Sequence, residues 1–237
     1  MQVAIAGRLM RYAKRLLLHA LFTLVCISVG RAAVLIEWKT FGNLGTETTE
    51  PSATNDPGVG SSSLILGAGL SGDANGNRFG GTGWFNTGNT AGGNTLPEAV
   101  AGDSFIEFTV TPTAGFEVSL ASLLFSWQRS TTGPSSLSLR SSADSYVLTL
   151  GTVTGLSTTL STGNNLAITG LSSFTTATTF RLYGYGATSA AGTGGFDTAT
   201  DVANVQLNGT IVAVPEPTAV ALLLVAVGVA GLRRRRE

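Results

Sequence analysis

Histidine and cysteine, which can act as catalytic bases, nucleophiles and zinc ligands, occur once each in the sequence, as His19 and Cys26. Both lie in an N-terminal segment that we expect to be removed from the mature protein. The mature chain would then hold no disulfide, no Cys/His zinc site and no Ser-His-Asp or Cys-His pair. We therefore expect a protein that is not an enzyme and that uses no cofactor.

A second candidate for chemistry is the stretch SGDANGNRFGG, in which Asp73, Asn75 and Asn77 alternate as oxygen donors. A calcium-binding EF-hand loop would need Gly at the sixth position and Glu at the twelfth, counted from Asp73, and these positions hold Arg78 and Trp84. We interpret the stretch as a turn whose side chains bond to their own backbone, and we predict no metal site there.

Glu107 and Glu117 are the carboxylates that come nearest to the pair that glycoside hydrolysis requires, one protonated acid and one ionised base or nucleophile. Both fall where strand alternation predicts a solvent-facing position or a strand start. No feature of the sequence places them in one cleft, so we do not favour a hydrolase.

Aromatic and charged residues in two strand-like stretches could bind a sugar. Trp127 and Arg129 lie in FSWQRSTTGPSS, and Tyr183 and Tyr185 lie in FRLYGYGA. An aromatic ring can stack on a pyranose while charged groups bond its hydroxyls, so these four residues are candidate glycan contacts. In the alternative that we favour, Trp127 belongs to the hydrophobic core.

The elements that must position these residues show period-two alternation, which is typical of half-buried strands. One apolar face is predicted in each of the following sets: Ile106, Phe108 and Val110; Leu123, Phe125 and Trp127; Tyr146, Leu148 and Leu150; Phe180 and Leu182; Val205, Leu207 and Ile211.

About nine or ten such strands, separated by glycine-rich turns, predict an all-β fold in which two antiparallel sheets pack as a β-sandwich. A jelly-roll arrangement is our first choice of topology and another β-sandwich is the second. We find no convincing helical stripe before the C-terminus. Residues 42–63 are predicted to form a surface loop.

The charges are distributed unevenly along the chain. Residues 33–214 contain five basic and twelve acidic residues, a net charge of −7, whereas arginines concentrate at both ends of the sequence. An acidic body without basic clusters argues against nucleic-acid binding, which needs lysine and arginine to displace counterions from phosphates.

The N-terminus has the organisation of a secretory signal peptide. A basic region up to Arg15 precedes an apolar run from Leu16 to Val29, and small residues follow. We predict cleavage after Ala32. The apolar run is too short for an ordinary membrane span, which needs roughly 20 residues.

The C-terminus has a second apolar run, from Thr218 to Leu232, with 15 uncharged residues. As a helix it would be about 22 Å long, short for a hydrocarbon core of roughly 30 Å. We predict a transmembrane helix that local thinning of the bilayer accommodates. The positive-inside rule keeps the following arginines cytoplasmic and so places the preceding domain outside. These arginines are Arg233, Arg234, Arg235 and Arg236.

Pro215, Glu216 and Pro217, followed by this apolar run and the arginine cluster, resemble the PEP-CTERM sorting signal of Gram-negative bacteria that make extracellular polysaccharide. The resemblance covers about the last 24 residues, with all three parts in the right order. It implies recognition by an exosortase, a membrane cysteine protease-transpeptidase that would cut near Pro-Glu-Pro. The interior is similar, more loosely, to β-sandwich ectodomains found on such proteins.

These features divide the chain into a signal peptide (1–32), a β-sandwich ectodomain (33–213) and a sorting signal (214–237). We expect export through the inner membrane, which the chain occupies transiently, and a final location at the cell surface or outside the cell. The expected function is structural or adhesive, within an extracellular matrix or biofilm. The alternative is a lectin-like module that binds extracellular polysaccharide.

Overall fold

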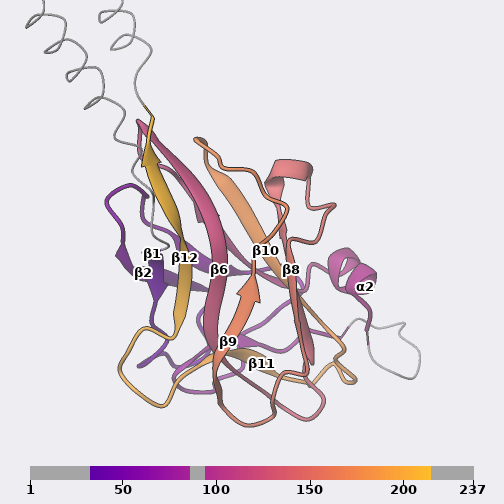
Figure 1. Cartoon of the computed structure of the whole chain (residues 1–237). Coiled ribbons are helices and arrows are strands. Elements are labelled where there is room, and N and C mark those ends of the chain that lie inside the picture. The colour runs from indigo at the N-terminus through magenta and orange to yellow at the C-terminus, as the bar shows by residue number, and fades with distance from the viewer. Residues whose placement is uncertain (1–32, 86–93, 215–237) are drawn as a thin grey trace, which may run out of the picture. The chain divides into compact units, whose positions relative to one another are not determined.

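The computed structural model of the protein describes residues 33–85 and 94–214 (Figure 1). The expected signal helix and the expected transmembrane helix both lie outside these described residues. Between residues 33 and 85 and between 94 and 214, no helix is long and apolar enough to span a membrane.

The described residues form an all-β fold with almost no helix, as the sequence predicts. All strand pairs are antiparallel. The strands are β1 (Ala33–Trp38), β2 (Thr49–Asn55), β3 (Ser63–Leu66), β4 (Arg78–Gly81), β5 (Phe105–Val110), β6 (Phe116–Arg129), β7 (Ser136–Ser141), β8 (Gly151–Thr154), β9 (Ser161–Ala167), β10 (Thr178–Tyr185), β11 (Gly194–Asp197) and β12 (Val205–Ala213). The helical elements are α2 (Leu96–Ala101) and the 3-10 turn η1 (Ser142–Asp144).

The sheet folds on itself at β2. Its strand order is β4-β11-β6-β12-β1-β2-β3-β5-β10-β7-β8, and β9 pairs with β6. Residues 52–55 of β2 pair with β1, whereas residues 49–51 pair with β3, so one strand belongs to both layers. The result is sandwich-like, as predicted, but this strand order does not confirm a jelly roll.

Aromatic side chains from both layers fill the space between them. The ring centroids of Trp38 on β1 and Phe108 on β5 lie 5.5 Å apart. On β6 the predicted apolar face is confirmed, because Leu123, Phe125 and Trp127 are all buried. Offset and edge-on ring pairs of this kind add stabilisation beyond the apolar area that they bury.

Strand β6 defines two ends of the fold, which Figure 1 shows along its length. At the terminal end, Phe116 lies opposite Ala213 of β12, and Ala33 of β1 lies opposite Gly209 of the same strand. At the opposite end, which we name the pocket end for the polar pocket that it carries, β6 finishes at Arg129. The strand has 14 residues, so these two ends are about 40 Å apart along it.

The predicted strand at residues 146–150 is wrong, because most of this segment is a turn. Ser145 and Tyr146 have positive φ angles of 61° and 62°. The Asp144 carboxylate accepts hydrogen bonds from the backbone N–H groups of Val147 and Leu148, which satisfies donors that a strand ladder would otherwise take. The strand begins only at Gly151.

The predicted surface loop at 42–63 is also corrected, because it contains β2. This strand, TEPSATN, has no apolar face to bury and lies mostly exposed at the junction between the layers. Period-two hydrophobicity therefore gives no signal for it, and Pro51 argues against a strand interior.

A short helix that the sequence pattern did not predict, α2, covers part of the outer face of the layer that contains β5 and β10. Thr95 and Glu98 form a capping box at the start of this helix, in which the backbone N–H of Thr95 donates to the Glu98 carboxylate at 2.6 Å. Pro97 lies in the first turn. The helix buries Ala99 against Phe105 and Tyr183.

We predict that Gly184→Ala destabilises the fold. A Cβ at this position would lie 2.4 Å from the ring of Trp84, which is fully buried and donates a hydrogen bond to the Gly81 carbonyl. Overpacking of this kind costs about 1–3 kcal/mol, measurable as a lower urea midpoint. The control is Gly60→Ala, whose Cβ would have no neighbour closer than 3.6 Å. Equal midpoints for the two variants would contradict this packing.

Candidate functional site

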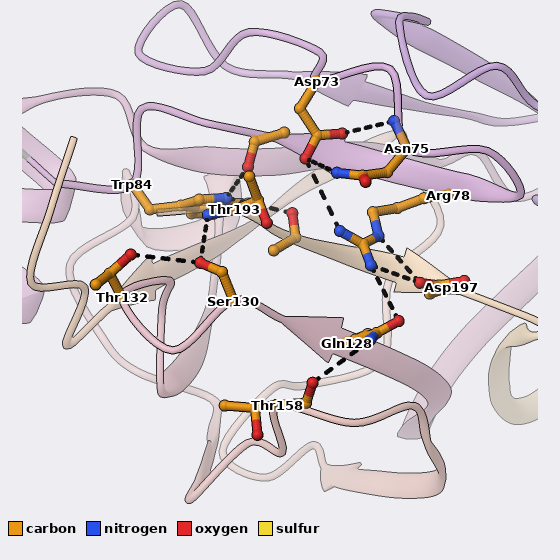
Figure 2. A network of polar contacts seen from close by, with 12 residues as sticks. Asp73, Asn75, Arg78, Trp84, Gln128, Ser130, Thr132, Thr158, Thr193 and Asp197 are labelled. Carbon is orange, nitrogen blue, oxygen red and sulfur yellow. Dashed lines mark hydrogen bonds and ion pairs between the residues drawn. The ribbon is translucent and has the colours of Figure 1, made fainter. Parts of the chain in front are cut away.

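The candidate site is a polar pocket of about 410 Å³ at the pocket end of β6. Its walls come from the turn before β4 and the start of that strand, the end of β6, the loop after it, the loop between β8 and β9, and the segment entering β11. Figure 2 shows the polar network that forms the site. The residues that line it are Asn75, Arg78, Gln128, Arg129, Ser130, Thr131, Thr158 and Thr193.

Arg78 forms the floor of this network. Its Nε and Nη2 atoms lie 3.0 and 2.7 Å from Oδ2 of Asp197, and its Nη1 lies 3.8 Å from a carboxylate oxygen of Asp73. The three side chains are only 7%, 11% and 5% exposed. A buried cation needs such partners, because removing it from water costs several kcal/mol.

The network continues from Arg78 to the rim. Nη2 of Arg78 also donates to the Gln128 side-chain oxygen at 3.1 Å, and the Gln128 amide nitrogen donates to the backbone carbonyl of Thr158. Figure 2 shows Gln128 between the buried arginine and this outer loop. Strand β6 thus joins the floor of the pocket to its edge.

The turn that carries Asp73 and Asn75 is the backbone-bonded turn that the sequence predicts. The backbone N–H of Asn75 donates to Oδ1 of Asp73, two residues earlier, at 3.3 Å. Ala74 and Asn77 adopt positive φ angles of 57° and 62°. Gly45 lets a neighbouring loop approach this turn, because a Cβ there would lie 2.3 Å from the Asn75 carbonyl oxygen.

Arg129 holds the loop that follows β6. Its Nε donates to the Leu156 carbonyl at 2.7 Å, and its Nη1 lies within 3.4 Å of the carbonyls of Ser130, Thr131 and Gly133. These contacts fix the guanidinium at the pocket wall. Its Nη2 donates no hydrogen bond within the part of the chain that the structure describes.

The chemistry of the pocket is that of hydrogen bonding. Its lining provides four hydroxyls, two amides and two guanidinium groups. Within residues 33–85 and 94–214, no three His, Cys, Asp or Glu side chains gather as a metal site. An arrangement of this kind can recognise a polar ligand through many weak, directional contacts.

The four candidate glycan contacts do not converge on one surface. Trp127 is fully buried and Tyr183 is 1% exposed beneath α2, so neither ring has a free face on which a sugar could stack. Tyr185 is half-buried beside the same helix. Of the four, only Arg129 lines the pocket, and the stacking role of Trp127 and Tyr183 is corrected.

Arg181, on the outer side of β10, forms a structural cluster with residues of β5 and of the turn at Tyr146. Nε of Arg181 lies 2.7 Å from Oε2 of Glu107, and its Cζ lies 4.3 and 4.2 Å from the ring centroids of Phe105 and Tyr146. Burial is the largest single influence on the pKa of Arg181 and lowers it. The Glu107 carboxylate and the nearby tyrosines raise this pKa, and together they outweigh burial, so the pKa lies above its ordinary value. Its charge is permanent and is used to join strands.

The two carboxylates considered for hydrolysis lie on different strands with different partners. Glu107 on β5 is paired with Arg181, whereas Glu117 on β6 accepts a hydrogen bond from Ser173. Neither lines the pocket described above. The structure does not bring them together as an acid and a base.

No pattern of neighbouring residues predicts the ion pair at the floor of the pocket. Arg78 occupies a position where the calcium-loop pattern requires glycine, and its partner Asp197 is 119 positions away. Pairing at this distance depends on the register of β11 with β4, in which Asp197 lies opposite Arg78. Neighbouring-residue patterns cannot give that register.

At the terminal end, the fold continues to the last described residue. Ala213 of β12 lies opposite Phe116, and the backbone N–H of Val214 donates to the Gly115 carbonyl at 2.8 Å. The predicted sorting residues Pro215, Glu216 and Pro217 lie outside the described residues, as do Arg233 to Arg236. The folded domain therefore reaches the residue that precedes Pro215.

Residues 213–236 match the PEP-CTERM protein-sorting motif. The chain thus carries the sorting motif that its Pro-Glu-Pro, apolar and arginine-rich segments predict. PEP-CTERM motifs are processed by exosortases, which indicates an exported protein that is sorted outside the cell. No curated protein and no solved structure matches the chain.

We predict that Asp197→Ala destabilises the protein by about 3–5 kcal/mol, because it leaves the buried Arg78 charge without its nearest partner. The control is Asp201→Ala, which breaks a pair with Lys39 whose side chains are 62% and 40% exposed. Exposed pairs of this kind contribute at most about 1 kcal/mol. Urea unfolding measures both, and similar losses of stability would contradict the assignment.

Proposed function

We propose that this protein is an exosortase substrate that is displayed at the cell surface or released from it, where it has a structural or adhesive role in an extracellular matrix or biofilm. The observation that carries the proposal is the PEP-CTERM motif at residues 213–236. The proposed route is export through the inner membrane, with the arginine tail retained in the cytoplasm until an exosortase cuts near Pro215 to Pro217.

The termini of the domain support this route. The N-terminal strand begins at Ala33 and pairs with β12, so signal cleavage after Ala32 would leave β1 complete. The C-terminal strand ends at Ala213, so a cut at or beyond Pro215 would leave β12 complete. Both proposed processing sites thus border the folded domain without entering a strand.

Two features support a role that is not enzymatic. Removal of the signal peptide would leave no histidine and no cysteine, and Glu107 and Glu117 are held by separate partners. The domain is also acidic, with a net charge of −7 over residues 33–214. Net charge of this size favours solubility outside the cell and disfavours nucleic acid as a partner.

The test is replacement of Pro215, Glu216 and Pro217 by alanine in the native host. We expect the full chain to accumulate in the membrane fraction with its arginine tail, because the exosortase would no longer recognise the junction. Immunoblotting of membrane, surface and medium fractions measures the change. The Asp201→Ala variant is the control, since it alters an exposed loop carboxylate and should be sorted normally.

Normal processing of the alanine variant would contradict exosortase sorting through this motif. Loss of both variants from every fraction would instead indicate failed folding, which thermal melting of the purified chains distinguishes from failed sorting. The matrix role is tested separately, by the cohesion of biofilm from a deletion strain complemented with either form. An unchanged biofilm in the deletion strain would contradict that role.

A carbohydrate-binding module is the second candidate. The buried Trp127 and Tyr183 no longer support it. The observation that favours it is the hydroxyl- and amide-rich pocket at the end of β6.

A further inference from the structure

The pocket at the end of β6 is lined by polar side chains alone. It contains hydroxyl, amide and guanidinium side chains, and it contains no aromatic, apolar or carboxylate side chain. Its volume of about 410 Å³ lies within the ordinary range for small-ligand sites. A ligand that fits this lining must have many hydrogen-bonding groups and no large apolar face.

Several donors of the pocket have no partner within the described residues. The Thr131 and Thr158 side chains are exposed, and their hydroxyls form no hydrogen bond to another described residue. Arg129 uses Nε and Nη1 on four backbone carbonyls and leaves Nη2 without a hydrogen bond among residues 33–85 and 94–214. The Arg129 guanidinium and the backbone carbonyls of Thr131 and Thr158 are held by these contacts, whereas the two hydroxyls and Nη2 are open to a ligand.

The pocket has one cation that is not neutralised. Arg78 is balanced by Asp197 and Asp73, which lie behind the lining rather than in it. Arg129 has no ion-pair partner among the described residues and binds only backbone carbonyls. A single carboxylate on the ligand would accept a charge-assisted hydrogen bond from the Arg129 guanidinium and neutralise its charge.

We propose that this pocket binds an acidic sugar, a uronic acid residue of a polysaccharide. Nη2 of Arg129 donates a hydrogen bond to its carboxylate, and the Thr131 and Thr158 hydroxyls and the Gln128 amide form hydrogen bonds with its ring hydroxyls. The inference gives the carbohydrate-binding alternative a site. It does not depend on sorting, because the purified chain can bind whether or not an exosortase processes it.

Other classes of ligand fit the lining less well. For a nucleobase, the lining offers no aromatic ring on which the base could stack. For a densely charged polyanion, it offers one unpaired arginine on a domain of net charge −7. For a lipid chain, the lining offers no apolar side chain to pack against. A sugar with one carboxylate matches both the number of hydroxyls and the single cation.

The location of the pocket suits a polysaccharide ligand. The pocket lies at one end of β6, whereas Val214 lies beyond the other end, about 40 Å away along the strand. A chain held at its C-terminus would therefore present the pocket at the far end of the domain. Binding there needs no change at the processing site.

The binding test uses the full chain purified in detergent, titrated by calorimetry with the methyl glycosides of galacturonate, glucuronate and mannuronate, each of which carries one carboxylate. Each is compared with the neutral glycoside obtained by reducing that carboxyl group to an alcohol. We expect at least one uronate to bind at least about 10-fold more tightly than its reduced form, because Arg129 loses a charge-assisted partner. Equal affinities within every pair, or no binding of any uronate, would overturn the proposal.

A pair of threonine variants locates the binding site. Thr158→Val removes a hydroxyl that has no hydrogen-bond partner among the described residues, and we expect a loss of affinity of about 3- to 10-fold. Thr210→Val is the matched control, since Thr210 lies on β12 near the terminal end. The melting temperature of each variant is measured to exclude unfolding. If only the control loses affinity, or if neither variant does, the ligand lies elsewhere and the assignment is overturned.

Discussion

Strand β6 is the element on which the rest of the fold depends, because it pairs with three others along its length. Its first part pairs with β12, its middle part also pairs with β9, and its last residues pair with β11. Each backbone hydrogen bond contributes only about 1 kcal/mol net, but together these ladders fix the register of distant segments. Through β11 the same strand brings Asp197 to Arg78, and through β12 it carries the chain to Val214.

This arrangement separates two tasks in space. The terminal end joins the first and last strands of the domain, where processing is proposed. The pocket end holds a buried ion pair beneath a rim of hydroxyls. Strand β6 connects the two ends, and no residue belongs to both of them. The domain can thus serve as a spacer that presents one polar surface away from its point of attachment.

The sequence predicted those features that neighbouring residues encode. Period-two alternation found the inner face of β6 and the faces of β5 and β10, and the order of Pro-Glu-Pro, apolar run and arginines identified the sorting motif. It missed β2, which buries no apolar face, and it misplaced the turn at Tyr146, where the Asp144 side chain replaces strand pairing. It also treated Tyr183 as an open aromatic residue, because the helix that covers it lies more than 80 positions away in sequence. The pocket escaped prediction for the same reason, since its walls meet only through sheet register.

Mass spectrometry of the mature protein from its native host tests the central claim most directly. The account predicts an N-terminus at Ala33 and a C-terminus at or beyond Val214 that lacks Arg233 to Arg236, so that β1 and β12 both remain whole. A mature surface protein that keeps the arginine tail would contradict exosortase processing. A C-terminus within β12 would contradict the conclusion that the folded domain extends unbroken to the sorting motif.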